Sequence, residues 1–249
     1  MEEKQAGIRI NKYLSMAGIC SRREADRELL AGHVKIDGRI ATAGERVRSG
    51  EQVFYKGNPV IWKEEPVLLA VYKPRGIVCT AQKKEKDNII DFLHYPIRVY
   101  PVGRLDKQSE GLILMTNEGD LVNKIMRAGN FHEKEYLVTV NKPLTEGFLQ
   151  GMSQGVPILE LNTVTRKCQV ERTGQRSFRI ILTQGLNRQI RRMCEYFGYR
   201  VVRLKRVRIM NICLGELTAG QYRDVSVGER ERLNEMIKNS RSGPAVWNV

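Results

Sequence analysis

The periodic spacing of apolar residues lapses close to residue 60 of this 249-residue chain, and that break limits what the chain can fold into. Before it, Ile10, Leu14 and Ala17 recur at the spacing of a helix face. After it, the uninterrupted apolar run 67–72 has the length of a buried strand. The intervening segment 56–65 carries Gly, Pro and charges and keeps neither period. The sequence therefore predicts a small N-terminal unit and a larger second unit.

The first sixty residues predict two helices followed by a hairpin. Ser21 and Glu24 have the spacing of a capping box, in which the serine caps a helix start and the glutamate reaches back to the serine amide. Asp37-Gly38 lies between two short apolar segments and is a strong hairpin-turn signal. A further strand is expected at 52–55. The predicted order is helix, helix, hairpin, strand.

Strand and helix patterns are mixed without regular alternation after residue 67. This mixing predicts an α+β domain, with a mainly antiparallel mixed sheet and flanking helices, rather than a doubly wound sheet. The expected strands are 67–72, 112–116, 136–140, 176–183 and 200–204, and helices should start near Asn88, Asp120, Leu144 and Asn187. We expect domains at 1–58 and 67–238, a linker at 59–66 and a flexible tail at 239–249.

The chain is strongly basic, with 42 Lys and Arg against 28 Asp and Glu and a formal charge of +14. This excess indicates a polyanionic partner, either nucleic acid or an acidic membrane surface. Residues 163–209 hold 13 of the cations and two acids, which we interpret as a phosphate-binding surface. No apolar segment has the roughly 20 residues that span a bilayer. The N-terminus also lacks the apolar core of a signal peptide, so we expect a cytoplasmic protein without a membrane partner.

The cysteines and histidines are too scattered to predict a metal site. No CxxC pair exists, so neither a disulfide framework nor a zinc site is indicated. The chain also lacks a Gly-rich nucleotide fingerprint, and we expect no metal and no cofactor. The five cysteines, expected to be reduced structural thiols, are Cys20, Cys79, Cys168, Cys194 and Cys213, and the histidines are His33, His94 and His132.

One polar loop is the most informative segment of the chain. Gly103 and Gly111 bracket it, and it leads into the apolar run 112–116. Such a loop can present one acid, Asp106, at a fixed place beside rigid structure. Taken alone the signal is weak, because an aspartate in a turn usually serves the turn itself.

The residues around this loop resemble those of pseudouridine synthases, in the branch typified by the small-subunit ribosomal RNA enzyme. The resemblance covers residues 8 to 235, and its N-terminal part resembles the RNA-binding module named after ribosomal small-subunit protein four. The segments that carry it are IRINKYL (8–14), CSRREA (20–25), GHVKIDG (32–38), YKPRG (72–76), GRLD (103–106), SEGLILMTN (109–117) and GLNRQIRRM (185–193). Three further segments are most similar to the large-subunit (23S) enzymes of the F type: RAGN (127–130), HEKEYLVTV (132–140) and RIMN (208–211).

The resemblance implies a cofactor-free isomerisation of a flipped-out uridine, with Asp106 as the catalytic aspartate. A carboxylate there can stabilise an oxocarbenium-like centre, attack it or assist its proton loss, and the sequence leaves these open. Arg191 is implied as the partner that keeps this carboxylate ionised, and Tyr136 as the ring that stacks on uracil. The remaining implied contacts are Ile190 packing on the base, Arg104 assisting flipping, Arg188 and Arg192 binding substrate, and Arg9, Lys12, Arg22 and Arg23 meeting RNA phosphates.

Two other functions stay open at this point. A non-catalytic RNA-binding assembly factor would explain the charge and the N-terminal module. A two-metal nuclease would need a carboxylate cluster, for which Asp106, Glu110, Glu118 and Asp120 are the nearest residues. The expected partner is ribosomal RNA, with 23S RNA favoured, or an assembly intermediate, with transfer RNA as a further candidate. We expect a monomer.

Overall fold

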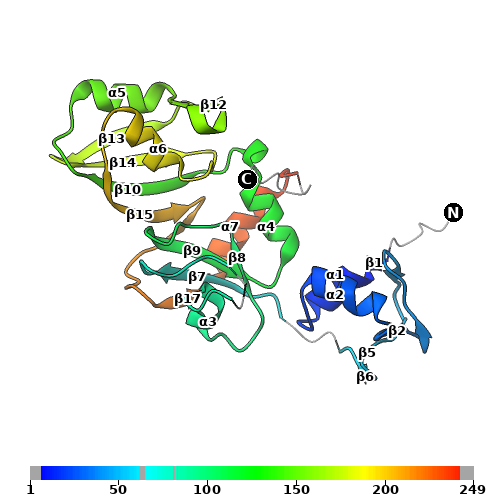
Figure 1. Cartoon of the computed structure of the whole chain (residues 1–249). Coiled ribbons are helices and arrows are strands. Elements are labelled where there is room, and N and C mark those ends of the chain that lie inside the picture. The colour runs from blue at the N-terminus through cyan, green and yellow to red at the C-terminus, as the bar shows by residue number, and fades with distance from the viewer. Residues whose placement is uncertain (1–6, 62–64, 81, 83, 242–249) are drawn as a thin grey trace. The chain divides into compact units, whose positions relative to one another are not determined.

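The structure is a computed structural model that describes residues 7–61, 65–80, 82 and 84–241 (Figure 1). The chain divides into two compact units, residues 1–66 with 96–98 and residues 67–95 with 99–249. Residues 62–64 of the predicted linker and 242–249 of the predicted tail lie outside the described residues. The predicted α+β class is confirmed, because a helical module precedes a mixed, mainly antiparallel sheet with flanking helices.

The N-terminal unit follows the predicted order. Ser21 caps the second helix and Glu24 reaches back to it, so the predicted capping box is present. Asp37 and Gly38 both have positive φ, at 47° and 83°, as a two-residue hairpin turn requires. Val60 is buried in this unit's core, so the unit extends into the predicted linker. Its elements are β1 (Ile8–Arg9), α1 (Ile10–Met16), α2 (Arg22–Leu30), β2 (Val34–Ile36), β3 (Arg39–Ile40), β4 (Arg46–Val47), β5 (Val53–Tyr55) and β6 (Asn58–Pro59).

The larger unit is built on one sheet with the strand order β13-β14-β10-β15-β9-β7-β17. All its pairings are antiparallel except β9 with β15. Its strands are β7 (Leu68–Lys73), β8 (Tyr100–Val102), β9 (Glu110–Thr116), β10 (Lys134–Val140), β13 (Gln169–Gly174), β14 (Ser177–Leu182), β15 (Val201–Ile209), β16 (Ile212–Cys213) and β17 (Tyr222–Asp224), with β11 (Pro157–Ile158) and β12 (Thr163–Val164) pairing separately. Its helices are α3 (Ile89–Leu93), α4 (Gly119–Met126), η1 (Ala128–Asn130), α5 (Glu146–Gln154), η2 (Leu159–Leu161), α6 (Gln189–Tyr196) and α7 (Val227–Ile237).

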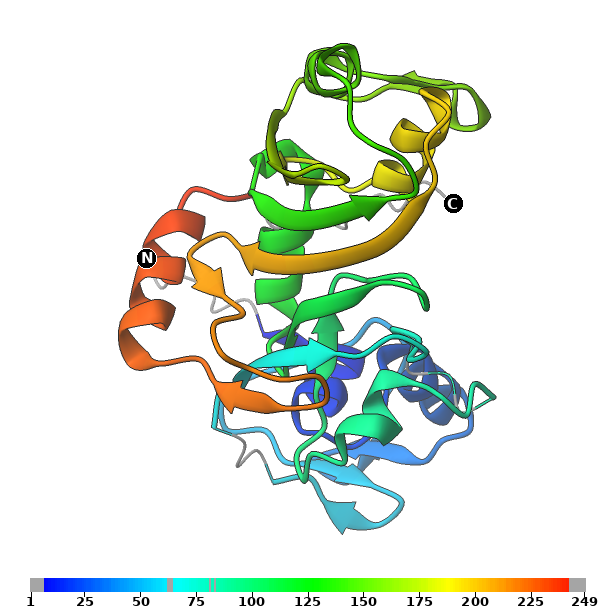
Figure 2. The same cartoon turned by 90° about the vertical axis from the view of Figure 1, so that its left-hand side faces the viewer.

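Helices cover the two faces of this sheet at different ends. Leu112 and Leu114 of β9 pack in one cluster with Leu121 of α4 and Leu233 of α7. The opposite face carries Tyr136, whose Cα lies opposite Ile180 of β14 and Arg206 of β15. On that face α5 packs on β14, since the rings of Phe148 and Phe178 lie 5.4 Å apart. Figure 2 shows β10 and β15 side by side in the sheet.

The parallel contact between β9 and β15 depends on one glycine. Gly111 lies opposite Arg206 and has a φ of +105°. A Cβ at Gly111 would lie 2.2 Å from the Arg206 carbonyl oxygen, so a larger residue cannot occupy this position without moving a strand. The glycine therefore sets how closely the strand after the Asp106 loop approaches β15.

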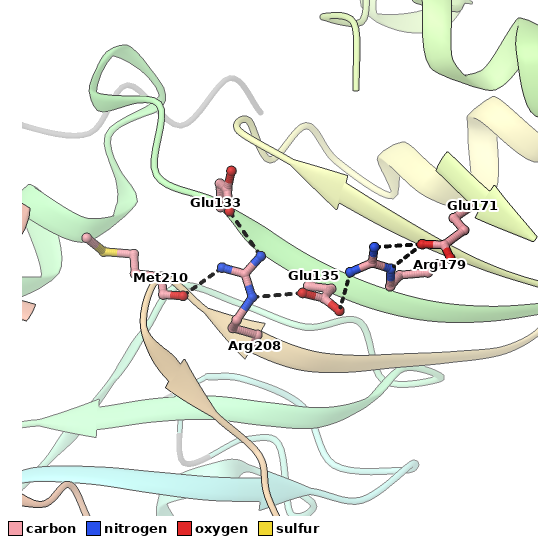
Figure 3. A network of polar contacts seen from close by, with 6 residues as sticks. All are labelled: Glu133, Glu135, Glu171, Arg179, Arg208 and Met210. Carbon is pink, nitrogen blue, oxygen red and sulfur yellow. Dashed lines mark hydrogen bonds and ion pairs between the residues drawn. The ribbon is translucent and has the colours of Figure 1, made fainter. Parts of the chain in front are cut away.

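A charged ladder lies on the sheet face opposite Tyr136 (Figure 3). Glu135 binds Arg208 at 2.7 Å and Arg179 at 3.4 Å, and these arginines also bind Glu133 and Glu171. The expectation that residues 163–209 form one phosphate-binding surface is therefore only partly met, because glutamates neutralise several of these arginines. A cavity of about 400 Å³ beside Arg179 and Glu171 contains none of the predicted site residues.

The C-terminal helix was not predicted, although Ser226 and Glu229 form a second capping box at its start. Residues shortly after this helix bind the segment that precedes β10. The Ser240 hydroxyl lies 2.8 Å from the Nε2 atom of His132, and the Arg241 amide donates to Asn130. Within the described ranges, no helix is both long enough and apolar enough to cross a bilayer.

Candidate active site

The Asp106 loop joins β8 to β9 and is held from within the larger unit. Its Ser109 amide donates to the Asp106 carbonyl at 3.0 Å, which closes a turn. Leu105 is buried, and its amide donates to the Cys79 sulfur at 3.4 Å. The Asp106 side chain remains 31% exposed. The loop therefore presents the carboxylate to an incoming molecule while its neighbours stay fixed.

Arg191 of α6 is the charged partner of that carboxylate. Its Nε atom lies 3.7 Å from Asp106 Oδ2, and its side chain is only 9% exposed. Its Nη2 atom donates to the Gln108 carbonyl at 3.3 Å and to the Ser109 hydroxyl at 3.2 Å. Burial lowers the pKa of Arg191, and the charge of Asp106 opposes that shift. One guanidinium therefore holds both the acid and the loop that carries it.

Tyr136 and Ile190 are both buried in this unit, at 8% and 4% exposure. Arg206 links the Tyr136 strand to the Asp106 loop, because it lies opposite both Tyr136 and Gly111. Its Nη1 atom also donates to the carbonyl of Arg104 at 3.4 Å. Tyr136, Arg206 and the Asp106 loop thus belong to neighbouring elements of one sheet face, and Ile190 precedes Arg191 in α6.

Three further buried cations surround this face and were missed from the sequence: Lys73, Lys134 and Arg206, each at most 4% exposed. Burial lowers the pKa of Lys73 and of Lys134 to about 8. Lys134 shares the two-residue period of Tyr136 and Val138, a signal that could have revealed it. Arg206 gives no such signal, because β15 is irregular where it pairs with β10.

The three predicted substrate-binding arginines differ in their surroundings. The side chains of Arg104 and Arg188 are exposed, and Arg188 precedes α6 with a φ of 50°. Arg192 instead pairs with Glu160 at 3.0 Å and donates to the Asn187 carbonyl at 3.1 Å. These contacts fix the start of α6, and the substrate contact of Arg192 stays a prediction.

The predicted RNA-binding residues of the N-terminal unit lie at its two helices. Arg9 is exposed and immediately precedes α1, and Lys12 is half-buried within α1. Arg22 and Arg23 are exposed in the first turn of α2, beside its capping box. The basic side chains thus concentrate at helix starts, where backbone amides also favour anions.

The carboxylates near Asp106 in sequence do not assemble into a metal site. Glu110 binds Arg203 at 2.5 Å and accepts from the Tyr72 hydroxyl at 3.2 Å. Glu118 pairs with Arg230 at the far end of β9. Among the described residues, no group of three or more His, Cys, Asp or Glu could hold a metal ion. The nuclease alternative therefore finds no ligand set in the part of the chain that the structure describes.

This geometry agrees with the comparison of the chain with known protein families. The model for RNA pseudouridylate synthases matches residues 67–196, which include Asp106, Tyr136 and Arg191, and the S4 domain model matches residues 8–53. The chain belongs to the RNA pseudouridylate synthase family. This synthase is therefore an enzyme of the isomerase class.

Its relatives extend the match over nearly the whole synthase. It is 54% identical over 239 residues to the dual-specificity RNA pseudouridine synthase RluF of Escherichia coli strain K12, covering 95% of this chain and 82% of that protein. It is 32% identical to the ribosomal large subunit pseudouridine synthase B of Bacillus subtilis, covering 94% and 98%. A crystal structure of a pseudouridylate synthase superposes with a TM-score of 0.68 at 27% identity, covering 91% of this chain and all of that one.

Proposed function

We propose that this synthase converts a uridine of ribosomal RNA, of the large subunit in particular, into pseudouridine. The observation that carries the proposal is the Asp106–Arg191 pair, 3.7 Å apart on a face that also holds Tyr136. A partly exposed carboxylate with a buried cationic partner is suited to act on a sugar, because the guanidinium fixes its position while substrate excludes water. We further propose that the enzyme acts as a cytoplasmic monomer.

The reaction that we propose balances within the substrate. The bond between N1 of uracil and C1′ of ribose breaks, the base turns, and a bond between C5 and C1′ forms. The proton on C5 leaves and N1 takes up a proton, so no group donor or oxidant is consumed. Asp106 acts at the ribose, Tyr136 stacks on the base, Ile190 packs against it, and the exposed Arg104 enters the space that the flipped nucleotide leaves.

The loss of the C5 proton provides the test. Ribosomal RNA would be isolated from cells that lack this protein and labelled with tritium at C5 of uracil. We expect the wild type to release tritium to water in the presence of chelator, and Asp106→Asn to bind the same RNA without releasing any. Binding without release by the wild type, on both free RNA and assembly intermediates, would instead favour the assembly-factor alternative.

The same assay addresses the choice of RNA. We expect release from 23S RNA to exceed release from 16S RNA, because segments 127–130, 132–140 and 208–211 resemble large-subunit enzymes of the F type. Transfer RNA would be tested in parallel. Release from 16S RNA alone would contradict the large-subunit assignment without contradicting the isomerase reaction.

A further inference from the structure

Phe131 is an unusual residue in the larger unit, because its aromatic side chain faces solvent in a constrained backbone conformation. It is 59% exposed and has a φ of 56°, a left-handed conformation that bulky residues rarely adopt. Residues kept in such conformations are held there by their surroundings and are frequent at ligand-binding sites. Packing in the hydrophobic core therefore does not explain why an aromatic residue occupies this position.

Arg166 holds one face of this ring. Its guanidinium carbon lies 4.1 Å from the centroid of the Phe131 ring, the geometry of a cation–π stack. The Nη1 atom of Arg166 donates to the Ala128 carbonyl at 2.9 Å and to the Thr183 carbonyl at 3.4 Å. Asn130 donates to the Lys124 carbonyl at 2.8 Å and so ties the turn before Phe131 to α4. The stacked pair is thus fixed before any ligand arrives.

The segments that meet at this pair lead directly into the proposed active site. Phe131 precedes β10, which carries Tyr136 five residues later. Thr183 begins the loop to α6, which carries Arg191. Five residues of fully extended chain span at most about 18 Å, so the Cα atoms of Phe131 and Tyr136 lie within that distance of each other. That is about five stacked nucleotides at 3.4 Å each.

We propose that Phe131, backed by Arg166, is a stacking platform for an unpaired base of the RNA close to the target uridine. Aromatic and arginine planes are the surfaces on which proteins stack splayed RNA bases. Arg166 adds a positive charge beside the base, which suits the polyanionic chain that carries it. The platform rests on the proposed RNA substrate and supplies a contact that the flipped uridine does not make.

The first test compares ring-removing and ring-retaining variants by their Kd for ribosomal RNA from cells lacking this protein. Phe131→Leu keeps an apolar side chain but removes the ring, and we expect its Kd to rise roughly 5- to 150-fold, the usual effect of losing one stacked base. Phe131→Tyr should stay within about twofold of the wild type. The slope of Kd with salt should be equal in all three, because no charge changes.

The second test reads the stack directly. A tryptophan placed by Phe131→Trp should lose fluorescence when the RNA binds, relative to the wild type. The matched control is Val227→Trp, at a position 75% exposed at the start of α7, where fluorescence should not change. An unchanged signal from the tryptophan at position 131 under saturating RNA would overturn the platform.

Other outcomes separate this inference from the proposed function. Normal tritium release by the wild type with an unchanged Kd for Phe131→Leu would overturn the platform alone. A lowered melting temperature for Phe131→Leu with an unchanged Kd would also overturn the platform. It would show that the ring stabilises the fold by packing against another part of the chain. Quenching at position 131 without tritium release by the wild type would support the platform and contradict the isomerase proposal. Failure of the wild type to bind the RNA would overturn both.

Discussion

Replacing Gly111 by alanine should disturb the active site through one backbone contact. The added Cβ would meet the Arg206 carbonyl oxygen at 2.2 Å and its amide nitrogen at 2.7 Å, and neither atom can rotate away. A φ of +105° adds strain of about 1–2 kcal/mol for an L-residue, and overpacking adds about 1–3 kcal/mol. We therefore expect a loss of about 2–5 kcal/mol in the free energy of unfolding, large against a typical total of about 5–15 kcal/mol.

Thermal unfolding followed by circular dichroism would measure this loss. At about 2–4 °C per kcal/mol for a unit of this size, the melting temperature should fall by roughly 4–20 °C. Gly215→Ala is the matched control, because Gly215 also has positive φ but nothing lies within 4 Å of an added Cβ. Gly111→Ala should also lose tritium release at least about tenfold at temperatures where it remains folded, since β15 carries Arg206. Melting temperatures of the two variants within about 2 °C of each other would refute the close approach of β9 and β15.

Three further predictions follow from individual contacts. Burial lowers the pKa of Lys134 to about 8 from an ordinary 10.5, so the folded state bears the full cost of a buried charge below pH 8, and that cost falls as pH rises from 8 to 10.5. The melting temperature of Lys134→Met, relative to that of the wild type, should therefore be higher at pH 7 than at pH 10.5. Equal differences in melting temperature at both pH values would contradict this. Asp106→Asn and Arg191→Met should each abolish most tritium release, and the double variant should lose little more, because paired residues act as a unit; additive losses would separate their roles. Each of Arg208 and Arg179 holds two glutamates, but Arg208→Met should lower the melting temperature more, because the Arg208 side chain is 21% exposed against 38% for Arg179 and also donates to the Met210 carbonyl; the reverse order in thermal unfolding would contradict it.

Most of the fold was predictable where local patterns are strong. The apolar runs predicted β7 and β9, and the Ser21–Glu24 spacing predicted the start of α2. The predicted strand at 200–204 was too short, because β15 continues through basic residues to Ile209. Pairing on both edges makes a strand of this segment, and neighbouring strands are not visible in local composition. The second capping box, at Ser226 and Glu229, could have been found by the same rule as the first.

The sequence indicated candidate residues for the site but not their geometry. Asp106 and Arg191 lie far apart in sequence, and only the resemblance to pseudouridine synthases indicated that they meet. The contact of Arg192 with Glu160 depends on η2, which no pattern predicted. Arg206 was hidden for a different reason. Register shifts where β15 pairs with β10 change which side chains share a face, so counting by twos along the sequence fails there.

The buried cations explain how irregular loops can form a rigid site. Lys73 donates at 2.8 Å to the carbonyls of Pro74 and Ile77, and Lys134 donates at 3.1 Å to that of His132. In each case a lysine of a strand donates hydrogen bonds to backbone carbonyls of the loop next to that strand.

Arg206 and Arg191 serve the Asp106 loop in the same way, through the carbonyls of Arg104 and Gln108. A loop that left these carbonyls to water would lose its partners when RNA covers the site, at a cost of about 1–3 kcal/mol for each buried group. Donors supplied by the sheet remain in place when water is excluded. We therefore expect the buried donors to keep the loop geometry around Asp106 unchanged between the free and the RNA-bound enzyme.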